Sequence, residues 1–194
     1  MEQKFLSLYD EHSHRDQRTL VLDRLRRDHR CIGACIEVLE HRLQVQRIFK
    51  GAASFTEKLI DQLLDAPDEF HHHLERSAYH RLRARIGRLV PDALDLVKHQ
   101  DEIRERRCDI MRFRDASPFG YMDSADTRAV LRNFCALRRS KIELEEEHLF
   151  PLFIKGLHSS DWACLQEEAE AYDAIVATLT PKNSRCNGVY ELHC

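Results

Sequence analysis

Hydrophobic residues recur at steps of three, four and seven along most of this chain, which is the spacing of one face of an α-helix. The first such segment spans residues 19–50, and Gly51 is expected to end it. A second segment spans residues 54–89, with Ser54 as a candidate N-cap. We expect a break at Pro67 because proline cannot continue the helical hydrogen bonding.

The same periodicity continues through the second half of the chain. A third segment spans residues 91–115, and a fourth spans residues 124–156, with a kink expected at Pro151. A shorter amphipathic segment spans residues 161–179. The chain contains no strand pattern, internal repeat or domain boundary. It is therefore predicted to be all-α, with four long helices in an up-down bundle and an additional shorter C-terminal helix.

Length and composition limit the alternatives. The chain has 194 residues, which suits a single domain over residues 1–180 followed by a polar tail over 181–194. The net charge of −3 gives no basic stripe for nucleic acid. No apolar run approaches the ~20 residues of a membrane span, and the polar N-terminus lacks a signal-peptide pattern. A cytoplasmic location with seven free cysteines is therefore expected.

Polar residues occupy positions in the helical stripes where apolar residues are expected. An ionisable group buried without a partner costs several kcal/mol, about 2–7 even when uncharged. A single buried histidine is usually a hydrogen-bonded core residue. Four helices that each carry such residues favour a shared cation, because imidazole and carboxylate together suit iron, zinc or manganese. The residues in these positions are His29, His71, Glu75, His99, Lys141, Glu145 and His148.

Their spacing is similar to that of a known family. His71 and Glu75 are four residues apart and share a helix face, and Lys141 and Glu145 repeat this spacing. The segments 28–30 (Asp-His-Arg), 71–75 (His-His-His-Leu-Glu) and 145–151 (Glu-Glu-Glu-His-Leu-Phe-Pro) resemble the signature segments of hemerythrin-like (HHE) proteins. The resemblance covers about residues 20–162.

The resemblance implies a four-helix fold that binds non-haem iron, usually as a pair of ions bridged by the carboxylates of two His-x-x-x-Glu pairs. It also implies roles in sensing dioxygen or nitric oxide, in iron storage or repair, and in stress responses. The positions that match family ligands are His29, His71, Glu75 and Glu145.

Two positions depart from the family pattern. Lys141 stands where the second His-x-x-x-Glu pair should have its histidine, and an ammonium group has no lone pair for a metal unless desolvation removes its proton. The family spacing places Gln100 at the third-helix ligand position, whereas the hydrophobic stripe favours His99 as the ligand.

Three states of the site follow from these departures. Two ions bind if His148, His12 or His14 substitutes as a ligand. One ion binds if the Lys141 ammonium replaces the second cation and pairs with Glu75 or Glu145. In the third state no metal binds. His72 and His73 are expected to face solvent or to support the ligands from outside, whereas Glu146 and Glu147 are expected to form a solvated acidic face.

The sequence favours a metal-binding sensor or carrier over an enzyme, because it contains no nucleophile–base pair, glycine-rich phosphate loop or Ser-His-Asp pattern. The expected partners are a metal ion and a small ligand such as dioxygen or nitric oxide. The competing hypothesis is a metal-free, degenerate member of the family that acts as a regulatory or interaction module. The sequence leaves homodimer formation open.

Overall fold

The computed structural model describes residues 2–44, 50–64, 67–87, 90–91, 94–116 and 125–179 of the chain. The expected polar tail lies outside these residues. Every regular element within them is helical, so the all-α prediction is confirmed. The elements are α1 (Glu2–Gln44), α2 (Lys50–Leu64), α3 (Pro67–Ile86), α4 (Leu96–Ala116), α5 (Ala125–Leu144), the π-helix η4 (Glu145–Leu149), α6 (Phe150–Gly156) and α7 (Ser159–Leu179).

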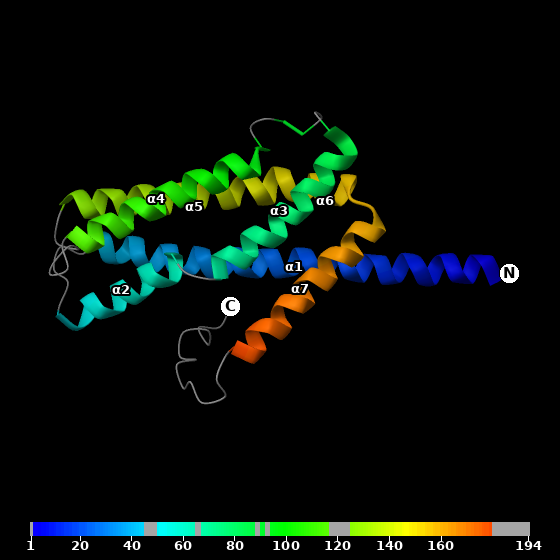
Figure 1. Cartoon of the computed structure of the whole chain (residues 1–194), viewed down its shortest axis with the longest axis horizontal. Helices are drawn as coiled ribbons and strands as arrows, with labels where there is room; N and C mark the ends of the chain where they lie inside the picture. Colours follow the sequence, from blue (N-terminus) through cyan, green and yellow to red (C-terminus); the bar gives the residue numbers. More distant parts are fainter. Residues whose placement is uncertain are drawn as a thin grey trace.

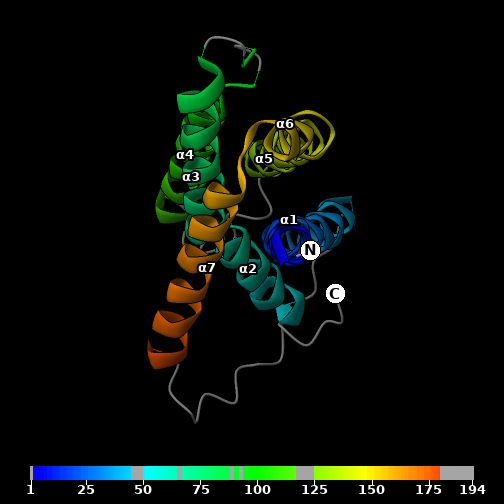
Figure 2. The same cartoon turned by 90° about the vertical axis from the view of Figure 1, so that its right-hand side faces the viewer.

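Four helices contact one another in cyclic order. The long helix α1 packs against α3 and α5, and α4 packs against the same two helices. Figure 1 shows α4 and α5 lying side by side above α1, while α7 crosses α1 obliquely. Figure 2 shows the same packing from the end of α1, with α2 beneath α3. The finer prediction of an up-down four-helix course stays a prediction.

The apolar core is divided into two clusters by a layer of buried polar groups. Along α1, Leu25 belongs to one cluster and Ile36 to the other, and His29 lies between them. Along the α5–η4 segment, Phe134 and Leu149 belong to different clusters in the same way. The polar layer therefore crosses the middle of the helix packing, where ionisable groups are held away from water.

Two predicted helix boundaries near the start of α2 are wrong. α1 ends at Gln44, and α2 already begins at Lys50, so Gly51 lies inside the first turn of α2 and does not end a helix. Ser54 lies within α2 and is not its N-cap. One glycine costs a helix only about 1 kcal/mol, which tertiary packing outweighs. The break at Pro67 is confirmed, since this proline is the first residue of α3.

The turn between α3 and α4 also differs from expectation. α3 ends at Ile86, and Gly87 takes a left-handed conformation with φ of +56°, which favours glycine after a helix. α4 begins at Leu96 and not at residue 91, because the Asp95 carboxylate caps it by accepting hydrogen bonds from the N–H groups of Val97 and Lys98, at 3.1 and 3.3 Å.

The C-terminal helix is anchored through Asp161. Its carboxylate accepts a hydrogen bond from the His158 N–H at 2.8 Å and pairs with Arg85 of α3 at 2.5 Å. This contact fixes the start of α7 against α3. None of the helices in the described part of the chain is both long and apolar enough to span a membrane.

Candidate metal centre

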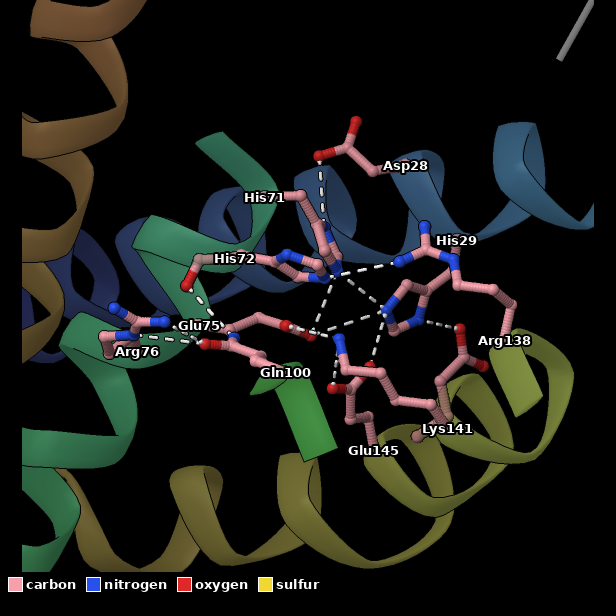
Figure 3. Close-up of polar contacts among 11 residues, drawn as sticks. Asp28, His29, His71, His72, Glu75, Arg76, Gln100, Arg138, Lys141 and Glu145 are labelled. Atoms are coloured by element: carbon pink, nitrogen blue, oxygen red, sulfur yellow. Dashed lines mark hydrogen bonds and ion pairs between the residues drawn. The ribbon is translucent and has the colours of Figure 1, made fainter. Parts of the chain in front are cut away.

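Four potential metal ligands converge in the buried polar layer. α1 supplies His29, α3 supplies His71 and Glu75, and η4 supplies Glu145. All four are at most 3% exposed, and one nitrogen or oxygen atom of each lies within 4.8 Å of the corresponding atoms of the other three. They are therefore close enough to hold a metal ion, and Figure 3 shows their side chains directed toward one another.

The donor atoms that face the centre are defined by short distances. The Nε2 atoms of His29 and His71 are 3.0 Å apart. His71 Nε2 lies 3.0 Å from Glu75 Oε1, and His29 Nε2 lies 3.2 Å from Glu145 Oε2. His71 and Glu75 meet because residues four apart on a helix share a face. Both rings thus present Nε2 to the two carboxylates.

The opposite nitrogen of each ring contacts a second carboxylate. His29 Nδ1 lies 2.8 Å from Glu146 Oε1, and His71 Nδ1 lies 3.4 Å from Asp28 Oδ2. Such outer carboxylates fix the tautomer and orientation of metal-binding histidines and strengthen the imidazole as a ligand. The expectation that Glu146 faces solvent is wrong, since this carboxylate is half-buried and orients His29.

Lys141 lies inside the same layer and pairs with both carboxylates of the centre. Its Nζ atom is 2.8 Å from Glu145 Oε1 and 3.2 Å from Glu75 Oε2. Burial alone would lower the pKa of Lys141, but the carboxylates of Glu145 and Glu75 outweigh it and raise the pKa above its ordinary value. In this arrangement the lysine keeps its proton and acts as a buried cation.

The same charges act on the other groups of the layer. Burial disfavours the charged imidazole of His29, yet Glu145 and Glu75 raise its pKa to about 10. The pKa of His71 is also raised, because Glu75 and Asp28 outweigh the effect of burial. Burial opposes ionisation of Glu75, but His71 and Lys141 hold its pKa well below the ordinary value. The site therefore presents the ionised carboxylate of Glu75 to any cation.

Several carboxylate oxygens in the layer lack a hydrogen bond. Glu75 Oε1 and both oxygens of Glu145 accept none among the described residues, although each lies within ion-pair distance of a nitrogen. Buried polar atoms are usually satisfied by hydrogen bonds, and exceptions often mark a missing ion or water. Two imidazoles and two carboxylates with open lone pairs fit a transition-metal ion.

The local helix geometry explains how Glu145 reaches the centre. η4 is a five-residue π-helix, and the Phe150 N–H donates to the Glu145 carbonyl five residues earlier. Pro151 follows, and its missing N–H and bulky ring disfavour a regular α-turn at this point. π-turns inside helices are frequent at functional sites. The disturbance expected at Pro151 thus takes the form of this wide turn.

The wide turn also decides which residues of the segment face inward. Leu149 and Phe150 are buried, and the Phe150 ring stacks on His29 with ring centres 5.4 Å apart. His148 is exposed, so the prediction that it faces the core is wrong. In a regular α-helix, His148 would follow Glu145 on the same face, but the longer π-turn brings the next two residues there instead.

α4 places an amide and not an imidazole next to the centre. Gln100 is 2% exposed; its Nε2 donates to the His72 carbonyl at 3.3 Å, and its Oε1 accepts from Arg76 at 2.8 and 3.1 Å. His99 is only half-buried, and the structure does not bring it into the group of four. The side chains of His12 and His14 lie outside the described residues.

Comparison with known proteins adds no relative. No protein-family model, curated protein or solved structure matches this chain. The class that the structure defines is therefore an all-helical protein with a buried His₂Glu₂ group that is close enough to hold a metal ion.

Proposed function

We propose that this chain binds one transition-metal ion through His29, His71, Glu75 and Glu145, and that it serves as a metal-dependent sensor or carrier. One observation carries the proposal: each imidazole presents Nε2 to the buried carboxylates, while its Nδ1 contacts an outer carboxylate. Metal-ligating histidines have this arrangement, and core histidines have no general need for it.

Iron is the metal that we propose for the site. Imidazole and carboxylate donors also suit zinc and manganese, so the donor set alone does not select iron. The segments at residues 28–30, 71–75 and 145–151 resemble those of hemerythrin-like proteins and favour iron on that ground. Four protein donors leave coordination positions for a small ligand, which supports dioxygen or nitric oxide as the molecule sensed.

A single ion fits the surrounding charges better than two ions do. The Lys141 ammonium already contacts Glu75 and Glu145, the two carboxylates that would bridge a pair of metal ions. A second divalent cation would lie beside this buried positive charge, and charge repulsion is strong where little water screens it. Gln100 is also held by Arg76 and the His72 carbonyl, so it offers no replacement ligand.

Metal analysis of the full chain, purified without a His-tag and reloaded anaerobically with Fe(II), tests the proposal. We expect about one iron per chain. His71→Ala should lose most of the bound iron, while His73→Ala, a matched change of an exposed histidine two residues away, should keep it. Equal iron content in the two variants, or no iron in the wild type, would contradict the assignment.

A second function is favoured by Lys141. Its two ion pairs satisfy Glu75 and Glu145 in part without any metal, which suits a metal-free bundle that acts as a regulatory or interaction module. The two functions differ in the response to a chelator. A metal-binding protein should lose thermal stability when its ion is removed, whereas a metal-free module should melt at the same temperature with and without chelator.

A further inference from the structure

A second polar feature lies between α3 and α4. It is a pocket of about 310 Å³, at the lower end of the ~300–1,000 Å³ typical of small-molecule sites. Ile103 contributes an apolar wall. The polar residues that line the pocket are His72, His73, Arg76, Gln100, Arg104 and Arg107.

The lining is basic, and the helical phase explains why. On α4, positions 100, 103, 104 and 107 follow steps of three and four, so they form one stripe that faces α3. Three arginines and two histidines line the pocket, and none of its lining residues is acidic. The chain as a whole carries a net charge of −3, so this positive charge is a local feature.

The arginines are also available for a ligand. Among the described side chains, neither Arg76 nor Arg107 pairs with a carboxylate. Arg76 donates instead to the neutral Gln100 Oε1 through Nε and Nη2, at 3.1 and 2.8 Å. Arg104 pairs with Asp101 at 2.6 Å, but both side chains are more than half exposed, and such surface pairs are weak.

We propose that this pocket binds a phosphate group, either as inorganic phosphate or as the monoester of a small molecule. A phosphate carries a charge of about −1.5 to −2 at neutral pH and offers three strong acceptor oxygens. Guanidinium groups bind such oxygens in paired hydrogen bonds. A monocarboxylate has one charge and two oxygens, so it uses this set of three guanidinium groups less completely.

The surface next to the pocket leaves room for the rest of a monoester. His73 and Arg76 also line a second, adjoining pocket, which continues along α3 over Ser77 and His80 to Arg81. A phosphate held between α3 and α4 could therefore carry a substituent along α3. This proposal does not rest on the metal centre, although α3 supplies residues to both sites.

Calorimetric titration of the metal-free full chain with sodium phosphate in chelator-containing buffer at low salt tests the proposal. The titration contains no metal, so its outcome does not depend on whether the proposed centre binds one, and failure of this proposal is distinguishable from failure of the proposed function. We expect one saturable site per chain. Losing one charged hydrogen-bonding partner should weaken binding about tenfold or more in Arg107→Gln and in Arg76→Gln.

Arg112→Gln is the matched control, because Arg112 is an exposed arginine of α4 that does not line the pocket. It should bind phosphate like the wild type. A second titration, with phenyl phosphate, distinguishes a phosphate monoester from inorganic phosphate as the ligand. Tighter binding of phenyl phosphate than of inorganic phosphate assigns the site to a monoester, and equal binding assigns it to the free ion. Arg107→Gln remains decisive if Arg76→Gln fails to fold. No saturable binding, or one affinity in wild type, Arg107→Gln and Arg112→Gln, would overturn the proposal.

Discussion

Replacing Lys141 by methionine removes the buried ammonium and keeps an unbranched side chain in its place. Lys141 is 5% exposed, and Glu75 and Glu145 are fully buried. Removing one partner of a buried ion pair typically costs about 3–5 kcal/mol, because the remaining charge is left uncompensated. For a chain of this size each kcal/mol shifts the melting temperature by about 2–4 °C. Metal-free Lys141→Met should therefore melt roughly 6–20 °C below the metal-free wild type.

Metal binding should restore the thermal stability that Lys141→Met loses. A bound cation faces the same two carboxylates, and in the variant it no longer meets the Lys141 ammonium. Two unit charges about 4 Å apart interact by about 4 kcal/mol at an effective dielectric constant of 20, so relief from this repulsion is substantial. Lys141→Met should bind Fe(II) or Mn(II) more tightly than the wild type, and added metal should raise its melting temperature by more.

Lys141→His is the matched variant, because it also removes the ammonium but supplies an imidazole four residues before Glu145. It restores the His-x-x-x-Glu spacing, so we expect two metal ions per chain, compared with one in the wild type and in Lys141→Met. Thermal unfolding with chelator and with metal, followed by metal analysis, makes both comparisons. The reasoning is refuted if metal-free Lys141→Met has the same melting temperature as the metal-free wild type. It is also refuted if the wild type, Lys141→Met and Lys141→His bind the same amount of metal.

Two further predictions concern groups around the centre, and a third concerns the start of α7. Glu146→Gln should lower metal affinity about 10–100-fold by weakening the support of His29 Nδ1, while Glu147→Gln, at an exposed position, should not; competition with a chromogenic chelator measures both. Metal affinity should rise with pH toward about 10, where the His29 ring loses its proton, and calorimetry in two buffers should detect proton release at pH 7. Asp161→Ala should destabilise the chain by about 0.5–2 kcal/mol in urea unfolding, because the His158 N–H and Arg85 lose their partner.

Much of the candidate site follows from helical phase alone. His29, His71, Glu75 and Glu145 interrupt apolar stripes in long, regular helices, and the structure brings all four together. Buried ionisable residues on separate helices need a common partner, so their convergence is a consequence of burying the stripes. The predicted role of these residues as metal ligands remains a prediction.

The position on α4 could not be assigned from the sequence, because both candidates fit the same stripe. His99 lies three residues after Leu96 and four before Ile103, whereas Gln100 lies four after Leu96 and three before Ile103. The stripe fits Gln100 as well as His99, so it could not support the prediction that His99 is the ligand. The structure distinguishes them through Arg76, whose guanidinium holds the Gln100 amide at the bundle interior.

The π-turn explains why His148 and Glu146 differ from the prediction. A regular helical period through residues 145–149 predicts His148 inside and Glu146 outside. Pro151 was the available signal, since a proline within a helix requires the preceding turn to adjust. Its sequence position does not say whether the adjustment is a kink, a break or a wide turn, because packing of Leu149 and Phe150 decides among them.

The charge balance of the polar layer explains why a bound divalent metal ion would replace the protons on the two histidines. Four carboxylates surround the two imidazoles, and Lys141 and the buried Arg138 supply two positive charges within the same layer. Two positive charges are then still needed for balance. In the metal-free protein, protonation of the histidines contributes to this balance, since the pKa of both is raised. One divalent ion supplies the same charge and requires neutral rings, so it replaces those protons. A second divalent ion would exceed the balance by two charges, and the loss of Lys141 would remove one of them.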